Sequence, residues 1–218
     1  MKLHTTPGSP TSHKVRAVID HLGLSLETQY YDVRAGELRS PEYLALNPNG
    51  GVPTLVDGAF VLWESNAIMQ YLADKVPGNS LFPRDPQLRA DVVRWQCWEL
   101  AHFNRAFGTL AFETYAKPTF NIGLTDQVQV AAALPELTRR APVLERHLEN
   151  HRYLVGDGIT IADYSMIFLE AYRTRTPFDW QPYPNINAYF DRVRVVDSWV
   201  RTAPPDPSAA GGRSKAAA

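Results

Sequence analysis

The sequence predicts an α/β domain followed by an all-helical domain. Two short runs of β-forming residues, 54–56 and 60–62, flank Asp57-Gly58. This pair is the strongest short-range signal for a β-hairpin, because both residues tolerate a positive φ. Residues 77–86 are rich in proline and other breakers of regular structure, as linkers are. Beyond them the apolar residues follow helical spacing, so we expect the chain to divide near residue 77.

The first domain, residues 1–77, is expected to alternate strands and helices. Residues 3–5 are a short strand candidate, and 27–33 are rich in β formers. Between them, apolar residues at i, i+3, i+4 and i+7 predict a helix that ends near Gly23. A strand, a helix and a second strand imply a right-handed crossover, which makes the two strands parallel. The polar stretch that follows holds one helical turn, at 41–44.

The hairpin and the helix after it offer a place for a small ligand. Gly50-Gly51 let the backbone turn sharply and let a ligand approach it closely. Pro53 cannot donate to a sheet ladder, so it belongs at the mouth of the first hairpin strand. Glu64-Ser65 opens an amphipathic helix, whose first N–H groups suit a carboxylate. The order of elements matches a thioredoxin-like domain, with a strand edge beside an anion-binding helix start.

The second domain is expected to be all-helical over residues 89–203. A linker at 78–88 precedes it, and a flexible tail of small and polar residues follows at 204–218. Its first helix spans about 91–112 and is dense in aromatic residues. One more helix is expected at 184–196, with its apolar residues facing inward.

Two local signals in this domain concern helix interruptions and helix starts. A helix that opens near Thr125 carries Pro135 and Pro142, which remove backbone donors and should kink or split it. Thr160 and Asp163 have the spacing of a capping box, in which each side chain accepts from a backbone N–H of the other residue. Losing such a cap typically costs ~1 kcal/mol. We therefore assign this motif to folding and not to chemistry.

Composition excludes several classes of function. A net charge of −1 and a pI near 6.6 argue against nucleic acid or an anionic membrane as the main partner. No secretory signal is visible, and no apolar run approaches the roughly 18 residues of a membrane span, so a cytoplasmic location is expected. Cys97 is the single cysteine, which excludes an internal disulfide, and we expect it to be buried. The six histidines show no tight metal-binding spacing, so no metal is expected.

The stretch Asn47-Pro48 to Val52-Pro53-Thr54-Leu55, followed by Glu64-Ser65-Asn66-Ala67-Ile68, resembles the glutathione-binding core of the soluble, cytosolic-type glutathione S-transferases. The resemblance covers nearly the whole chain, to about residue 203. It implies glutathione as co-substrate, a homodimer, and a cis peptide bond before Pro53, with the Val52 backbone paired to the cysteinyl part of glutathione. The glutathione-binding residues expected on this basis are Asn49, Val52, Pro53, Glu64, Ser65 and Arg39.

One hydroxyl in the turn before the first helix is expected to activate the glutathione thiol. The run Ser9-Pro10-Thr11-Ser12, ahead of Lys14-Val15-Arg16, resembles the serine-type, bacterial-like members of the family, in which a serine directly before proline donates a hydrogen bond to the sulfur. That residue here is Ser9, with Thr11 and Ser12 as alternates. Ser9 is also a plausible helix cap, because Pro10 suits the first helical position. No tyrosine or cysteine of the other types is present in this turn.

The enzyme expected is one in which the glutathione thiolate attacks electrophilic, mostly apolar substrates. A non-catalytic, transferase-like binding protein is the alternative, as is a glutathione-dependent peroxidase or dehalogenase. Gly51 slightly favours the non-catalytic alternative, because many family members carry Gln or Lys directly before Val-Pro. Aromatic residues of the helical domain are candidates for the hydrophobic substrate site, although such a stripe is more often core. These candidates are Trp98, Phe103, Phe107, Phe112 and Tyr115.

Overall fold

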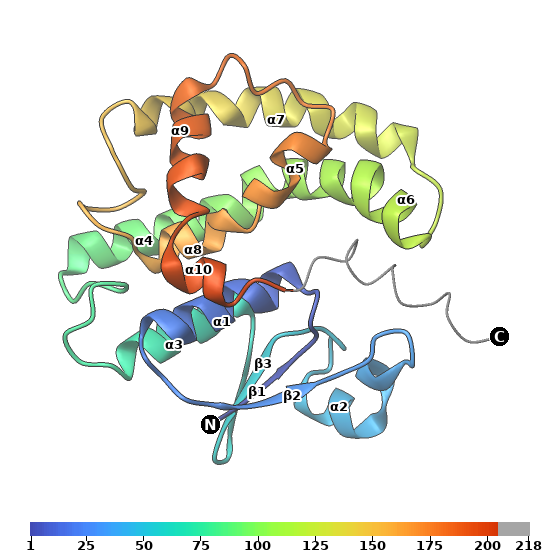
Figure 1. Cartoon of the computed structure of the whole chain (residues 1–218), viewed down its shortest axis with the longest axis vertical. Coiled ribbons are helices and arrows are strands. Elements are labelled where there is room, and N and C mark those ends of the chain that lie inside the picture. Colours follow the sequence, from blue (N-terminus) through green and yellow to red (C-terminus); the bar gives the residue numbers. More distant parts are fainter. Residues whose placement is uncertain (205–218) are drawn as a thin grey trace. The chain divides into compact units, whose positions relative to one another are not determined.

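The computed structural model describes residues 1–204, and the chain divides into two compact units. Unit 1 comprises Met1–Val76 together with the segment from Asp197, and unit 2 is Pro77–Val196. Unit 1 holds a sheet with helices. In unit 2, the described residues form helices joined by loops, without a strand (Figure 1). The predicted order of an α/β domain and a helical domain is confirmed. Of the tail predicted at 204–218, everything after residue 204 lies outside the described residues.

Unit 1 is built on a four-stranded sheet with the order β2-β1-β3-β4. The strands are β1 (Lys2–Thr5), β2 (Glu27–Tyr30), β3 (Thr54–Asp57) and β4 (Phe60–Trp63). β1 runs parallel to β2 and antiparallel to β3, and Leu3 lies opposite both Thr28 and Leu55. The parallel pair is the one that the crossover rule predicted.

Two helices of unit 1 pack against each other on one side of the strands, α1 (Pro10–His21) and α3 (Ser65–Asp74) (Figure 1). Between β2 and β3 the chain forms the 3-10 helix η1 (Glu37–Arg39) and α2 (Pro41–Leu46), more helix than the single turn predicted. Ser40 explains the addition, because its side chain accepts from the Tyr43 N–H and caps α2. The apolar side chains at the centre of this unit are fully buried. They include Leu3, Val15, Val18, Leu55, Ile68 and Leu72.

The hairpin is confirmed, but its turn lies one residue later than the Asp57-Gly58 pair suggested. Asp57 still pairs with Phe60, so the two loop residues are Gly58 and Ala59, with Gly58 at φ 60°. The Asp57 carboxylate accepts a hydrogen bond from the hydroxyl of Tyr71 in α3 at 2.8 Å. It also accepts from Lys75, the C-cap residue of α3. These bonds hold Asp57 in the strand, and the glycine alone supplies the positive φ.

The last described helix, α10 (Asp197–Arg201), belongs to unit 1 and not to the helical domain predicted over 89–203. The Trp199 ring stacks on His13 of α1 at 3.6 Å between centroids, and the Trp199 carbonyl lies 3.0 Å from His13 Nε2. Arg201 pairs with Asp20 at 2.6 Å. Burial lowers the pKa of His13 to about 4, so the ring that stacks on the indole is neutral at pH 7. Helical periodicity alone could not show on which unit this helix packs.

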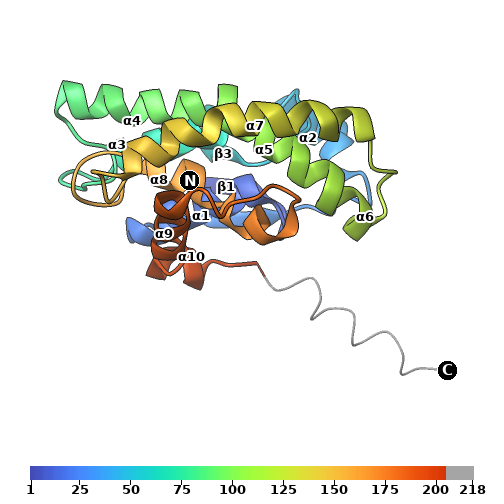
Figure 2. The same cartoon turned by 90° about the horizontal axis from the view of Figure 1, so that it is seen from above.

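Unit 2 opens with a long helical run that begins as α4 (Pro86–Trp98) and continues through α5 (Asn104–Ala111) to α6 (Lys117–Phe120). Two π-helical turns, η2 (Glu99–Phe103) and η3 (Phe112–Ala116), join these segments. The run is longer than the 91–112 predicted. It lies beside α7 (Gln127–Leu148), which packs on α5 (Figure 2).

Helix α7 contains both Pro135 and Pro142 and is one continuous helix, so of the two predicted outcomes the split is wrong. Its buried residues include Leu137, Ala141 and Leu144, which follow helical spacing. The packing of this apolar face outweighs the backbone donors that the prolines lack. Cys97 was predicted to be buried and is exposed, because the inward positions of α4 are taken by its neighbours Trp95 and Gln96.

The capping box is confirmed at the start of α8 (Ile161–Ile167), every residue of which is buried. The Asp163 carboxylate accepts from the N–H groups of Leu154 and Thr160, at 2.9 and 2.8 Å, and from the hydroxyls of Thr160 and Tyr189, both at 3.1 Å. After the 3-10 helix η4 (Glu170–Arg175) comes α9 (Pro184–Val193). Its inward residues are buried as predicted, namely Ile186, Tyr189, Phe190 and Val193.

No helix among the described residues is long and apolar enough to cross a membrane. In the same part of the chain, no cluster of three or more His, Cys, Asp or Glu side chains could hold a metal ion.

Candidate active site

A small pocket of about 110 Å³ lies in unit 1, where three segments meet. The start of α1 contributes Thr11, and the start of α3 contributes Glu64 and Ser65. The loop before β3 supplies the rest of the lining, which is Asn47, Asn49, Gly51, Val52 and Pro53. The structure therefore brings together five of the six residues that the sequence predicted for glutathione binding. The sixth, Arg39, lies at the edge of this loop.

The loop before β3 is held by buried polar groups that sequence reasoning missed. Asn47 donates through Nδ2 to the Gly51 carbonyl at 2.8 Å and to Thr54 Oγ1 at 3.1 Å. The Tyr43 hydroxyl donates to the same Gly51 carbonyl. Asn47 Oδ1 in turn accepts from the Asn49 N–H at 3.1 Å. These bonds fix the backbone of residues 47–54 before any ligand binds. Asn47 belongs to the motif by which the chain resembles the family, but the motif alone did not indicate that Asn47 holds the loop before β3 in place.

Val52 presents its backbone to the pocket. The Val52-Pro53 peptide bond is cis, as predicted. The Val52 carbonyl accepts a hydrogen bond from Thr11 Oγ1 at 3.1 Å. Its N–H has no acceptor within residues 1–204, because the ladders of β3 with its neighbours begin only at Thr54. A peptide can therefore pair with Val52 as an added strand pairs with a sheet edge.

Glu64 and Ser65 place the start of α3 at the pocket. Glu64 has φ 72° and ψ 111°, a conformation that costs a non-glycine residue on the order of 1–3 kcal/mol. The surrounding structure imposes this conformation, and it turns the chain directly into α3. The first N–H groups of α3 have no partner within the helix, and they carry the positive end of its dipole. This geometry suits the carboxylate that the sequence analysis expected here.

A buried lysine contacts this helix start, and little in the sequence indicated it. Lys14 of α1 is 1% exposed, and its Nζ donates to Asn66 Oδ1 at 2.8 Å. Asn66 follows Ser65 in the first turn of α3 and is itself buried. The Lys14 ammonium group thus fixes the side chain of a residue in the first turn of α3. The only signal was a lysine directly before Val15 on the buried face of α1.

The three candidate hydroxyls occupy different places. Ser9 is the N-cap of α1, and its Oγ accepts from the Ser12 N–H at 3.2 Å. Thr11 lines the pocket, and its Oγ1 lies 3.0 Å from Ser9 Oγ. Ser12 is fully buried, and its Oγ is shielded from solvent without a hydrogen-bond partner within the described residues. Of the three, only Thr11 lines the pocket, Ser9 lies beside Thr11, and Ser12 is buried in the protein interior.

The two glycines before Val52 have opposite environments. Gly50 has φ 60°, which strains any other residue, and a Cβ there would also lie 3.0 Å from the Leu38 carbonyl oxygen. Arg39 lies over this turn, with its Nη1 3.5 Å from the Asn49 carbonyl. A Cβ on Gly51 would have nothing within 4 Å. The pocket wall is therefore open at the position where many family members carry a long polar side chain.

The five aromatic residues predicted for the substrate site do not form one site within unit 2. Phe103 and Phe107 are fully buried, and Phe107 packs on Trp180 at 5.2 Å between centroids. Phe112 is 47% exposed, and the Tyr115 hydroxyl accepts from Arg175 at 3.0 Å. The two buried rings belong to the core, which is the more common role of an aromatic stripe on a helix.

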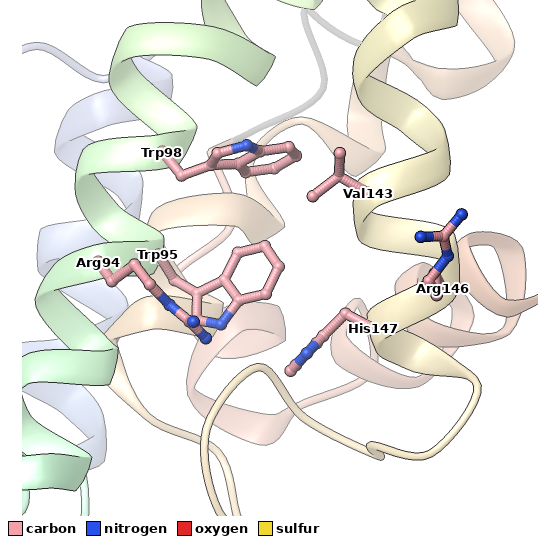
Figure 3. Close-up of a pocket in the computed structure, with 6 residues that line it drawn as sticks. All are labelled: Arg94, Trp95, Trp98, Val143, Arg146 and His147. Carbon is pink, nitrogen blue, oxygen red and sulfur yellow. The ribbon is translucent and has the colours of Figure 1, made fainter.

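Trp98 is half-buried and lines a separate pocket of about 380 Å³ between α4 and α7. Figure 3 shows its indole and that of Trp95 on one side of this space, with Val143 and His147 on the other. Arg94 and Arg146 lie at its rim, and Arg94 pairs with Asp91 at 2.6 Å. Burial lowers the pKa of His147, whose Nε2 lies 3.0 Å from the Leu154 carbonyl. The wall of this pocket is thus largely aromatic, and the loop before α8 contacts His147 through the Leu154 carbonyl.

Comparison with known proteins places this architecture in one family. Residues 1–74 match the model of the glutathione S-transferase N-terminal domain, and residues 103–195 match that of the C-terminal domain. The chain is 32% identical to glutathione S-transferase 3 of Zea mays over 95% of this chain and 97% of that protein.

Solved structures agree. Glutathione transferase F7 from Populus trichocarpa is 26% identical, with a TM-score of 0.85 over 93% of this chain and 97% of that chain. The theta class glutathione S-transferase from Xanthomonas axonopodis pv. citri, solved with glutathione bound, is 30% identical, with a TM-score of 0.81 over 93% and 96%. The fold and site thus define a thioredoxin-like domain joined to a helical domain. The chain belongs to the glutathione S-transferase family and is an enzyme of that class.

Proposed function

We propose that the pocket around Val52 binds glutathione as co-substrate and that the bound thiolate attacks electrophilic, mostly apolar molecules. The observation that carries this proposal is the unpaired Val52 N–H beside the start of α3. The first offers a strand edge to a peptide backbone, and the second offers positive charge to a carboxylate. Glutathione is a small peptide with carboxylates, so it matches both. A glutathione-bound relative of the same fold supports the assignment.

Residues in and beside the pocket have separate roles in this proposal. The Val52 backbone pairs with the cysteinyl part of glutathione, and Pro53 holds that backbone in place. Ser65 and the first turn of α3 bind a carboxylate, and Lys14 holds Asn66 of that turn in place. Asn49 and Arg39 bind the part of the ligand that reaches the loop before Val52. Proximity of the bound thiol to an apolar electrophile then supplies much of the rate.

We further propose that the enzyme is of the serine type, with Ser9 as the activating hydroxyl. A free thiol with a pKa near 8.5 is only about 3% thiolate at neutral pH. A hydrogen bond donated by Ser9, at the N-terminus of α1, stabilises the anion and lowers that pKa. Ser9 Oγ lies 3.0 Å from Thr11 Oγ1 of the pocket wall, which supports a place for the Ser9 hydroxyl beside a bound thiol.

Two measurements on the full chain test the function. Retention on immobilised glutathione tests binding, and turnover of a generic aryl halide with glutathione tests transfer. Retention with turnover is expected. Retention without turnover of an aryl halide, a peroxide or an alkyl halide would favour the non-catalytic alternative. Failure to be retained would reject the binding site itself.

We also propose a homodimer in the cytoplasm. β4 is an edge strand of the sheet, and its Phe60, Val61 and Trp63 side chains are 36–47% exposed, which leaves an apolar surface that a second copy can cover. Light scattering at micromolar concentration should give twice the chain mass of 24.5 kDa. A single species of the chain mass would contradict the dimer and leave the transferase activity untouched.

A further inference from the structure

Three hydrogen bonds join the start of α1 to Val52 in one chain of contacts. The Ser12 N–H donates to Ser9 Oγ at 3.2 Å, and the Ser9 and Thr11 hydroxyls lie 3.0 Å apart. Thr11 Oγ1 then donates to the Val52 carbonyl at 3.1 Å, across 41 residues of sequence. The hydroxyl proposed to activate sulfur is thus connected, through Thr11, to the backbone proposed to bind the peptide.

Counting protons fixes the direction of this chain. A hydroxyl has one proton and two lone pairs, and a carbonyl has no proton. The proton of Thr11 is committed to the Val52 carbonyl, so the proton between the two hydroxyls is that of Ser9. As long as this pattern holds, neither hydroxyl has a proton to give to a sulfur in the pocket. The thiol-activating donor is turned away from its acceptor.

A bound peptide can reverse the direction. In the proposed function, on which this inference rests, the glutathione backbone pairs with Val52. The Val52 carbonyl has two lone pairs, and a peptide N–H that arrives from the pocket side, which Thr11 also lines, competes with Thr11 for the one it uses. Thr11 can then donate to Ser9 Oγ, which has one lone pair beyond the one that accepts from the Ser12 N–H. The Ser9 proton is thereby released to the sulfur. Every hydroxyl keeps its own proton, and only the directions of the bonds change.

We propose that Thr11 is a positioning residue that relays occupancy of the Val52 carbonyl to Ser9. Ser9 donates to the sulfur only once a peptide backbone is seated on Val52. Thr11 acts through Ser9, which it also polarises, because a hydroxyl that accepts a hydrogen bond becomes a stronger donor. A thiol that enters the pocket without its peptide backbone is therefore not activated, and this makes the site selective for glutathione over simple thiols.

Thr11→Val tests the relay, since valine has the shape of threonine but no hydroxyl. Cooperative strengthening of about 10–30% of a charge-assisted hydrogen bond corresponds to about 0.1–0.7 of a pKa unit. The absorbance of bound thiolate, followed against pH, should therefore show the thiol pKa about 0.1–0.7 of a unit higher in Thr11→Val, with turnover at pH 7 lower by at most roughly fourfold. Thr11→Ser should restore the wild-type titration. An unchanged or lowered pKa in Thr11→Val would overturn the relay.

Thr114→Val is the matched control. Its hydroxyl also donates to a carbonyl, that of Leu110 at 2.8 Å, but it lies in unit 2. It should lose as much thermal stability as Thr11→Val and leave the thiol titration unchanged. A shift of that titration in both variants would assign the effect of Thr11→Val to stability alone and reject the relay.

A second ligand removes the signal without changing the protein. γ-Glutamyl-N-methylcysteinyl-glycine has no cysteinyl N–H to donate to the Val52 carbonyl. Its thiol, compared with that of glutathione after correction for their free pKa values, should titrate higher on the wild-type enzyme. The gap between the two ligands should close in Thr11→Val. An equal gap in both proteins would contradict the relay, and the wild-type comparison stands even where Thr11→Val does not fold.

Ser9→Ala separates this inference from the proposed function. If Ser9→Ala raises the thiol pKa and Thr11→Val does not, the relay fails and serine-type activation stands. If Ser9→Ala leaves the titration of bound glutathione in place, serine-type activation fails, and the relay fails with it.

Discussion

Two helix starts in this chain use the same local device for different ends. Ser9 caps α1 and Thr160 caps α8, and in each case the hydroxyl oxygen accepts an N–H from the first turn. Thr160 is 4% exposed, and its proton goes to Asp163, which also accepts from two N–H groups and from Tyr189. Ser9 is half-buried, and its proton goes to another hydroxyl at the wall of a pocket. One cap is closed within the protein and the other remains open to a ligand.

The difference shows what turns a cap into part of a site. At α8 every polar group is satisfied by a buried partner that cannot be exchanged, so the network contributes stability and uniqueness of packing. At α1 the chain of hydroxyls ends on a carbonyl that faces the pocket, and a ligand can take that acceptor. Sequence shows the cap in both cases. Whether the proton is free to be redirected depends on what surrounds the hydroxyl.

The largest effect is expected from breaking the closed network. Asp163→Ala removes the acceptor of four hydrogen bonds and leaves buried N–H groups of Leu154 and Thr160 without a partner. At about 1–3 kcal/mol for each buried group left unsatisfied, the free energy of unfolding should fall by roughly 3 kcal/mol or more. Thr160→Ala should cost only about 1 kcal/mol, as the loss of a cap does. Chemical denaturation measures both, and equal losses in the two variants would mean that Asp163 is no more than a cap.

The same network should make stability depend on pH. Burial raises the pKa of Asp163 from 3.8 to about 6, against the effect of its hydrogen bonds. Between these values the folded protein holds a proton on Asp163 that the unfolded chain has lost. The contribution of this proton to the free energy of unfolding is therefore complete below about pH 4 and declines as pH rises to about 6. The shift corresponds to about 3 kcal/mol. Unfolding at intervals from pH 4 to 7 should show this decline relative to Asp163→Asn, which cannot titrate. Parallel profiles of the two proteins would refute it.

An effect on catalysis, and little on stability, is expected from the open cap. Ser9→Ala should raise the pKa of the bound thiol by one to two units, because a charge-assisted hydrogen bond is worth about 1.5–3 kcal/mol. Turnover near neutral pH should fall about eight- to twenty-five-fold, as the thiolate fraction does, and recover in part as pH rises. Glutathione affinity should change little, since the Val52 backbone and the start of α3 remain.

The matched control for that variant is Ser12→Ala. Ser12 is one turn away and fully buried, and its hydroxyl has no partner within the described residues. Its loss should leave the thiol titration as in the wild type. A titration that moves in Ser12→Ala and not in Ser9→Ala would exchange the roles of the two serines.

Local signals predicted most of the fold, because they depend on neighbours in sequence. The hairpin, the crossover of β1 and β2, the capping box and the inward face of α9 all follow from spacing and turn residues. The misses depend on tertiary contacts. The hairpin turn moved because α3 holds Asp57, and α10 joined unit 1 because His13 and Asp20 of α1 bind it. No periodicity in the chain contains that information.

The site shows the same division. The motif around Val52-Pro53 and Glu64-Ser65 predicted which residues line the pocket, because their spacing is set by the hairpin between them. It did not predict the buried Lys14 or the scaffold role of Asn47, since both depend on side chains that meet across the fold. The aromatic stripe of unit 2 was the weakest guide, because the same helical spacing serves a core and a binding surface. Phe103 and Phe107 belong to the core.

The smallest expected effect, a gain, comes from completing the open wall of the pocket at Gly51. A side chain there meets nothing within 4 Å and needs no positive φ, so Gly51→Gln should fold without strain. Its amide can donate to the bound peptide, and a net hydrogen bond of about 0.5–1.5 kcal/mol would tighten glutathione binding by roughly two- to tenfold. The thiol pKa should stay the same, because the new contact lies on the peptide and not on the sulfur. Calorimetric titration with glutathione measures the gain, with Gly51→Ala as the control that adds a side chain but no donor. Equal affinities of the two variants would show that the peptide does not reach this part of the wall, and that Asn49 and Arg39 carry the binding at this side of the pocket without help from residue 51.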